Sequence, residues 1–267
     1  MCKRDISRGW RVGWPAIAGN ASRVPVRVRK LQTEDDVNIE ILGNGAFESA
    51  LVHLGPGERF ISESGALYRA SSNISVDVTA RSSGRTKGLL GGVKRLLAGD
   101  NFFMSTYHAA RGEAGEVGLA PTQQGEVFVV EVEPHTNWLC AGGSYLASAP
   151  EVQLDTQFQG LKGFFGGEKL FFVEASGAGP LLVSAFGRLV ENQVDGELTV
   201  DTGHVVAFES GLQYQVTKAG KSWFQSWLAG EGLVMKFSGQ GRLLTQSHNP
   251  TEFGASLGPL LPATSAR

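Results

Sequence analysis

The sequence predicts an all-β protein built from three internally repeated units. Three observations support this prediction: short segments with the composition of strands, 36 glycines in 267 residues, and a set of short motifs that recurs three times. The glycine share is about twice the ~7% of an average protein, and glycine is the residue that tight turns between strands need. Each unit is expected to fold as a β-sandwich or a double-stranded β-helix, with the three units around a pseudo-threefold axis.

Two segments show the strand pattern most clearly. ISVDV (74–78) and VFVVEV (127–132) are rich in β-branched and aromatic residues and follow the two-residue period of strands. No long amphipathic helix is predicted, and no run approaches the ~18 apolar residues that a membrane-spanning helix needs.

The first recurring motif reads LAGDNFFM (97–104), FGGEKLFF (165–172) and LAGEGLVM (228–235). Each copy places a glycine and an acidic residue before an apolar stretch. We predict that these pairs are structural turns that lead into the next strand. The pairs are Gly99 with Asp100, Gly167 with Glu168, and Gly230 with Glu231.

A second motif precedes the first in each unit. It reads SGALY (64–68), GGSYL (142–146) and SGLQY (210–214). An apolar strand opens each unit, and a glycine turn before another apolar strand closes it. Four markers in one order, three times over, are the strongest evidence for internal repetition.

These markers divide the chain. The predicted organisation is a basic leader at 1–36, β units at 37–123, 124–194 and 195–248, and a C-terminal tail at 249–267. The first 30 residues hold eight Lys or Arg and one acid, a charge of +7, so the rest of a chain with net charge -2 carries -9. Such a leader is a disordered tail, a targeting segment, or an arm that binds nucleic acid or lipid; its composition leaves these alternatives open.

Motifs of catalysis and metal binding are incomplete. GASLG (254–258) has the spacing of a nucleophile elbow, but no histidine follows it. AGKS (219–222) lacks the earlier glycine of a phosphate loop. The five histidines form no closely spaced pair, and Cys2 and Cys140 provide neither a cysteine metal site nor a disulfide framework. We therefore predict no catalytic residue, no cofactor and no metal ion, with Cys140 as a small buried apolar residue in a reducing cytoplasm.

The repeated acids leave one enzymatic alternative open. Asp100, Glu168 and Glu231 would come close together if they surrounded a threefold axis, and grouped carboxylates can carry out acid–base or metal chemistry. An acidic residue after a turn glycine more often bonds to the backbone of its own turn, so turn residues are expected.

The first unit contains a basic and apolar loop. Its stretch GLLGGVKR (88–95) has no counterpart in the other two units. Leucines flanked by cations can contact an anionic membrane or a partner protein. The alternative is a solvated loop whose leucines pack on the core or in an oligomer interface. The candidate contact residues are Lys87, Leu89, Leu90, Lys94 and Arg95.

Several segments resemble the altered inheritance of mitochondria protein 24 family, over about residues 37–262. They are NIEILGNGAFESALVHLGPGERFISESGALY (38–68), GLLGGVKRLLAGDNFF (88–103), GGSYLA (142–147), LVSAFG (182–187) and SHNPTEF (247–253). The resemblance implies a triplicated β-sandwich related to the tryptophan RNA-binding attenuation protein fold, homo-oligomers and no established reaction. Fungal mitochondrial members of the family are associated with the inner membrane, and bacterial members are mostly uncharacterised.

We therefore expect a non-enzymatic structural or scaffold protein that forms a homo-oligomer, with a trimer favoured. It is expected in the cytoplasm, with a peripheral contact to a membrane surface. Two alternatives stay open: a β module that binds a small ligand or RNA, and an enzyme that uses the repeated acids. The acidic body opposes phosphate contact, so no nucleic-acid partner is expected.

Overall fold

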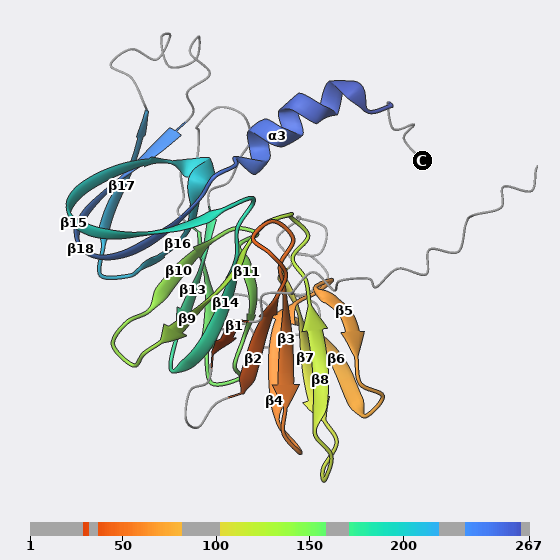
Figure 1. Cartoon of the computed structure of the whole chain (residues 1–267). Coiled ribbons are helices and arrows are strands. Elements are labelled where there is room, and N and C mark those ends of the chain that lie inside the picture. The colour runs from red at the N-terminus through yellow and green to blue at the C-terminus, as the bar shows by residue number, and fades with distance from the viewer. Residues whose placement is uncertain (1–28, 32–36, 82–101, 159–170, 219–232, 263–267) are drawn as a thin grey trace, which may run out of the picture.

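The computed structural model describes residues 29–31, 37–81, 102–158, 171–218 and 233–262, and this part is predominantly β-structure (Figure 1). The all-β prediction is confirmed. The strands are β1 (Arg29–Leu31), β2 (Asn38–Leu42), β3 (Ser49–Leu54), β4 (Arg59–Glu63), β5 (Leu67–Ala70), β6 (Ile74–Arg81), β7 (Phe102–Ala109), β8 (Gly115–Leu119), β9 (Val127–Val132), β10 (Trp138–Ala141), β11 (Tyr145–Ser148), β12 (Gln153–Phe158), β13 (Phe171–Ser176), β14 (Gly179–Ser184), β15 (Leu189–Asp201), β16 (Val205–Glu209), β17 (Gln213–Lys218) and β18 (Leu233–Gln246). The described helical elements are η1 (Thr202–His204), α3 (Pro250–Leu257) and η2 (Gly258–Leu260).

The strands form three sheets in which neighbouring strands are antiparallel. The first sheet has the order β1-β2-β3-β8-β5, and the second has the order β6-β7-β4-β11-β14-β9. The third has the order β12-β13-β10-β16-β18-β15, and β17 also pairs with β18. Strands that are neighbours in a sheet are often distant in sequence, so each sheet combines segments from different parts of the chain.

Two long strands build one end of the molecule. β15 and β18 pair from Leu189↔Gln246 to Asp201↔Val234 and curve together (Figure 1). Gly196 and Gly239 face each other within this ladder, both with positive φ, a conformation that glycine adopts without strain. β15 runs across the predicted unit boundary at 194/195, so residues on both sides of that position belong to one strand.

The apolar side chains form two buried clusters. In the larger one, Trp138, Tyr107 and Tyr145 are the biggest fully buried side chains. The hydroxyl groups of both tyrosines are hydrogen-bonded to serine hydroxyls, at 2.9 Å and 3.0 Å, which satisfies their polar atoms in the core.

The smaller cluster contains three buried aromatic rings and includes side chains of the long β15–β18 ladder. Phe208 contacts Phe172 and Phe237 edge to face, with ring centroids 5.3 Å and 5.1 Å apart. This geometry places the positive ring edge against the negative ring face. The cluster joins strands from the third sheet, because its rings come from β13, β16 and β18.

The motif SGALY lies between β4 and β5, and GGSYL lies between β10 and β11. SGLQY, however, lies between β16 and β17. The turn that leads into β16 is formed by η1. β15 runs directly into η1, whereas turns follow β3 and β9.

Helix α3 extends away from the sheets (Figure 1) and contains no buried residue. Asn249 caps its start, accepting backbone N–H bonds from Thr251 and Glu252 at 3.0 Å and 3.4 Å, and Pro250 occupies the first helical position. No helix in the described ranges is long and apolar enough to cross a membrane.

Candidate functional site

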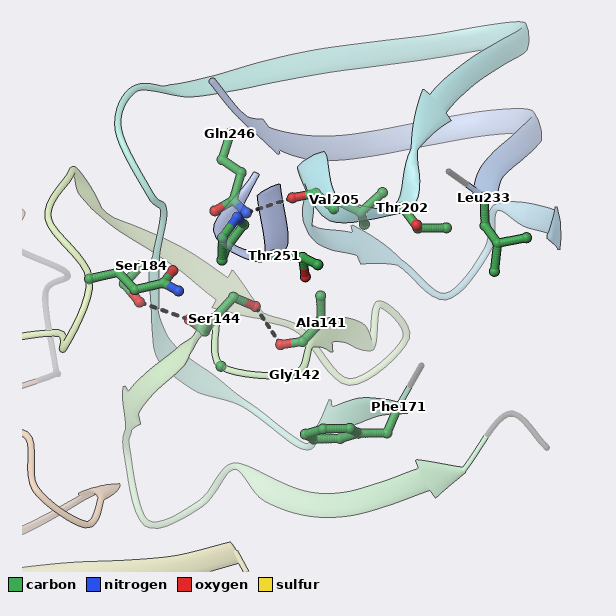
Figure 2. Close-up of a pocket in the computed structure, with 14 residues that line it drawn as sticks. Ala141, Gly142, Ser144, Phe171, Ser184, Thr202, Val205, Leu233, Gln246 and Thr251 are labelled. Carbon is green, nitrogen blue, oxygen red and sulfur yellow. Dashed lines mark hydrogen bonds between the residues drawn. The ribbon is translucent and has the colours of Figure 1, made fainter. Parts of the chain in front are cut away.

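An open pocket of about 370 Å³ lies where turns from distant parts of the chain meet (Figure 2). One wall is the turn between β10 and β11, and another is η1 with the start of α3. We call this cavity the Ser144 pocket. Its lining residues are Gln123, Ala141, Gly142, Gly143, Ser144, Phe171, Ser184, Thr202, Gly203, Val205, Leu233, Gln246, Pro250 and Thr251.

The β10–β11 turn is fixed by its glycines and by Ser144. Gly143 has a φ of +84°, and a Cβ on Gly142 would lie 2.5 Å from the ring of Phe171. The Ser144 hydroxyl lies 2.7 Å from the carbonyl oxygen of Ala141 and 2.6 Å from that of Val206, and it can donate to either. Ser144 therefore ties the turn to β16 in the third sheet.

Gln246 fixes the opposite wall. Its side-chain amide donates to the carbonyl of Gly203 at 2.8 Å, and its side-chain oxygen accepts from the backbone N–H of Phe186 at 2.8 Å. Asp201 accepts from the N–H of Gly203 at 2.9 Å and from the Asn249 side chain at 3.3 Å. These bonds connect η1 to β18 and to the cap of α3, so they hold this wall in place.

Among the residues that the structure describes, the lining of the pocket is polar but uncharged. None of the 14 lining residues has an ionisable side chain (Figure 2). Hydroxyl groups of Thr202 and Thr251 and the amide of Gln123 can donate and accept hydrogen bonds, while Phe171 and Leu233 supply apolar surface. This lining suits a small neutral ligand better than a charged one, because a buried charge needs a partner.

A second feature is the exposed apolar face of the C-terminal segment. Phe253 and Leu257 lie one turn apart on α3, Leu260 ends η2 and Leu261 follows it, and their side chains are 47%, 38%, 78% and 64% exposed. The Phe253 ring contacts Phe186 edge to face at 5.1 Å, which anchors the start of the segment to the body. We call these four residues the α3 surface.

The site residues predicted from sequence lie outside the described residues. This holds for the contact loop with Lys87, Leu89, Leu90, Lys94 and Arg95. It also holds for the glycine–acid pairs Gly99–Asp100, Gly167–Glu168 and Gly230–Glu231. Two of the three motifs that contain these pairs run into Phe171 and Leu233, which line the Ser144 pocket.

Sequence reasoning missed the Ser144 pocket and the α3 surface. The segments GGSYLA, LVSAFG and SHNPTEF each contribute to the pocket, through Ser144, Ser184 and Thr251. Their convergence could not be predicted from spacing within any one segment. The start of α3 did have a sequence signal, because Asn249 followed by Pro250 is typical of a helix N-terminus.

Three side chains outside the pocket have notable environments. Cys140 is fully buried with no disulfide, as predicted, and burial raises the pKa of its thiol to about 12. Burial also raises the pKa of Glu63, at the end of β4, to about 7. His204 in η1 forms a hydrogen bond of 2.7 Å between its Nδ1 and the carbonyl oxygen of Gln246. Among the described residues, no group of three or more His, Cys, Asp or Glu is placed to hold a metal ion.

The β-sheet fold and the sequence segments that line the Ser144 pocket point to one protein family. The sequence profile of the mitochondrial biogenesis AIM24 family matches residues 39–248. The chain therefore belongs to this family, and the resemblance found in the sequence is confirmed.

Two streptococcal proteins are similar to this chain. The uncharacterised protein M6_Spy0233 of Streptococcus pyogenes serotype M6 is 28% identical over 208 residues, which cover 76% of this chain and 82% of that protein. The crystal structure of protein SPYM3_0169 from Streptococcus pyogenes aligns with a TM-score of 0.70 and 26% identity, over 85% of this chain and all of that one.

Proposed function

We propose that this protein is a non-enzymatic scaffold that forms a homo-oligomer and contacts a membrane surface. The α3 surface is the observation that carries the membrane part. Its four large apolar side chains lie on a segment with no buried residue, which extends away from the sheets. Fully burying one leucine or phenylalanine side chain stabilises by roughly 1.5–3 kcal/mol, so a short apolar face can hold a protein at the boundary of headgroups and acyl chains.

Flotation with liposomes tests this membrane contact. We expect the protein to float with phosphatidylcholine vesicles and to lose at least fivefold of the floating fraction when Leu260→Ser and Leu261→Ser are combined. The matched control is Val76→Ser with Val78→Ser, which removes two exposed apolar side chains of β6 and should float like the unchanged protein. A separate variant with Leu89→Ser and Leu90→Ser, in vesicles that contain phosphatidylserine, tests the predicted basic loop.

The outcomes separate two uses of the α3 surface. If no vesicle composition floats the protein, the membrane contact is contradicted. If the Leu260/Leu261 variant instead changes the oligomer mass measured by light scattering, the surface is buried between copies of the chain.

Three related units are part of the proposal. Support comes from a one-residue irregularity in strand pairing that occurs three times, in β5–β8 after Leu67, in β11–β14 after Tyr145 and in β16–β18 after Val205. After each of β5, β11 and β16, a turn leads to the next strand. Each turn is closed by a backbone hydrogen bond of 3.1 Å, from the N–H of one residue to the carbonyl oxygen of the residue three positions earlier. The pseudo-threefold axis and the trimer are expectations that belong to the same proposal.

A second candidate function is the binding of a small neutral ligand in the Ser144 pocket. The openness of the pocket and the uncharged side chains among its described lining residues support it. Native mass spectrometry of the purified protein should then show an adduct that denaturation removes. Thr251→Trp, which fills the pocket, should remove the adduct, whereas Ser72→Trp in an exposed turn should keep it. An adduct that survives Thr251→Trp, or none at all, contradicts this candidate.

A further inference from the structure

Two strand pairings within the chain share one arrangement, and we call them junctions. In one, β4 pairs with β11, with Ser62 opposite Ala147. In the other, β10 pairs with β16, with Cys140 opposite Ala207. In each junction, the first strand ends directly before a three-residue turn. The second strand begins directly after the next three-residue turn along the chain. We call β4, β10 and residues 197–201 of β15 the b strands, and β5, β11 and β16 the c strands.

Both junctions have the same register. The three-residue turns are 64–66, 142–144 and 202–204. Counted from them, Ser62 and Cys140 are the second residues before a turn, and Ala147 and Ala207 are the third residues after one. The neighbouring pairs also correspond, since Ile61 lies opposite Ser148 and Leu139 lies opposite Phe208. A common register predicts how any further b strand would meet a c strand.

One b strand and one c strand have no such neighbour among the described strands. β5 is the last strand of the first sheet and pairs only with β8, and β15 pairs only with β18. Their counterparts pair on both edges. The chain therefore presents one open edge of each kind, and open edges readily pair with another chain.

The side chains of β5 are more exposed than those of the corresponding strands β11 and β16. Leu67 and Tyr68 are 39% and 48% exposed, and all four residues of β5 are exposed. The corresponding residues of β11 and β16 are 3% exposed or less, namely Tyr145, Leu146, Val205 and Val206. An apolar edge strand that is exposed in one position and buried in two equivalent positions indicates a missing neighbour.

The two open edges lie at opposite ends of the molecule (Figure 1), so they do not pair within one chain in this structure. A second copy of the chain supplies the required edge. Charge is compatible with this pairing, since residues 197–201 of β15 have two acids, Glu197 and Asp201, and no base, while β5 has Arg69, which also pairs with Glu116 of β8 at 3.1 Å.

We infer that copies of this protein join head to tail, with β5 of one copy antiparallel to residues 197–201 of β15 in the next. The common register places Ala70 opposite Thr199 and Arg69 opposite Val200. This inference rests on the oligomeric part of the proposed function and specifies its interface. The contact joins two different surfaces, so repetition yields a closed ring or an open fibre.

Disulfide trapping between separate chains tests the register. Ala70→Cys in one chain and Thr199→Cys in another, each with Cys2→Ser and co-expressed with different tags, should form a mixed disulfide on mild oxidation. Residues directly opposite each other in an antiparallel pair have Cα atoms about 4.5–5.5 Å apart, which is within disulfide range. The control combines Tyr68→Cys with Thr199→Cys, and we expect at least tenfold less of its product.

Light scattering on the same proteins separates the possible failures. One contradicting result is that oligomers form without the Ala70–Thr199 disulfide, and another is that they form with an equal amount of the off-register Tyr68–Thr199 disulfide. Either result contradicts the proposed interface but not the proposed oligomer. A monomer at every concentration overturns both.

A second variant tests the interface without oxidation. Tyr68→Lys leaves an exposed position exposed in the free chain but would bury a charge in the assembly, and it should raise the dissociation constant at least tenfold. Val78→Lys, on exposed β6, should leave it unchanged. An unchanged constant for Tyr68→Lys contradicts the inference.

Discussion

Gly125→Ala is expected to lower the free energy of unfolding by about 3–5 kcal/mol, or to prevent folding. The added Cβ would fall against the carbonyl oxygen of Ala185 and 2.5 Å from the backbone N of Gly187, which is closer than Cβ atoms pack. Both neighbours are backbone atoms, so no side-chain rotation relieves the overlap, and overpacking of this kind strongly destabilises.

The surrounding backbone cannot shift without breaking bonds. Gly125 and Gly187 form a parallel bridge, the N–H of Glu126 donates to Gly187 at 3.0 Å, and the N–H of Ala185 donates to Glu126 at 2.9 Å. These bonds lock the segment that leads into β9 to the segment that leads into β15. Urea unfolding followed by circular dichroism measures the effect. Gly211→Ala is the control, since a Cβ there meets nothing within 4 Å; a loss below about 1 kcal/mol at Gly125 would contradict the expected overlap.

Trp138→Ala is expected to cost about 4 kcal/mol of stability. Trp138 is the largest fully buried side chain, its indole N–H donates to the carbonyl of Glu131 at 3.2 Å, and Arg242 lies 4.9 Å from the ring centroid. Truncation leaves a large cavity at the centre of the main core and removes a cation–π contact.

Thermal and urea unfolding, followed by far-ultraviolet circular dichroism, measure this loss. Trp138→Phe keeps part of the ring volume, so it should lose clearly less, about 1–2 kcal/mol. Equal losses for the two variants would show that the indole N–H, rather than the ring volume, provides the stabilisation.

The fold class could be predicted because strands have a local signature. VFVVEV coincides with β9 and ISVDV opens β6. A two-residue period identifies a buried face but does not identify the neighbouring strand. The junctions β4–β11 and β10–β16 therefore had no signal in the sequence.

The Ser144 pocket was out of reach for the same reason. Its walls come from turns more than 100 residues apart, from Ala141 to Thr251, and turn residues have no periodicity. Gly142 and Ser144 were noted only as members of a recurring motif. The structure shows that Gly142 admits the ring of Phe171 and that Ser144 ties two sheets together.

The position of β18 within its sheet has a consequence for synthesis of the chain. β18 comes last of all the described strands, yet it pairs with β15 along one edge and with β16 and β17 along the other. The ribosome therefore releases three strands of this sheet before the strand that holds them together. Until residues 233–246 emerge, the edges of β15, β16 and β17 that pair with β18 lack their shared neighbour, so this sheet cannot close before that segment has been synthesised.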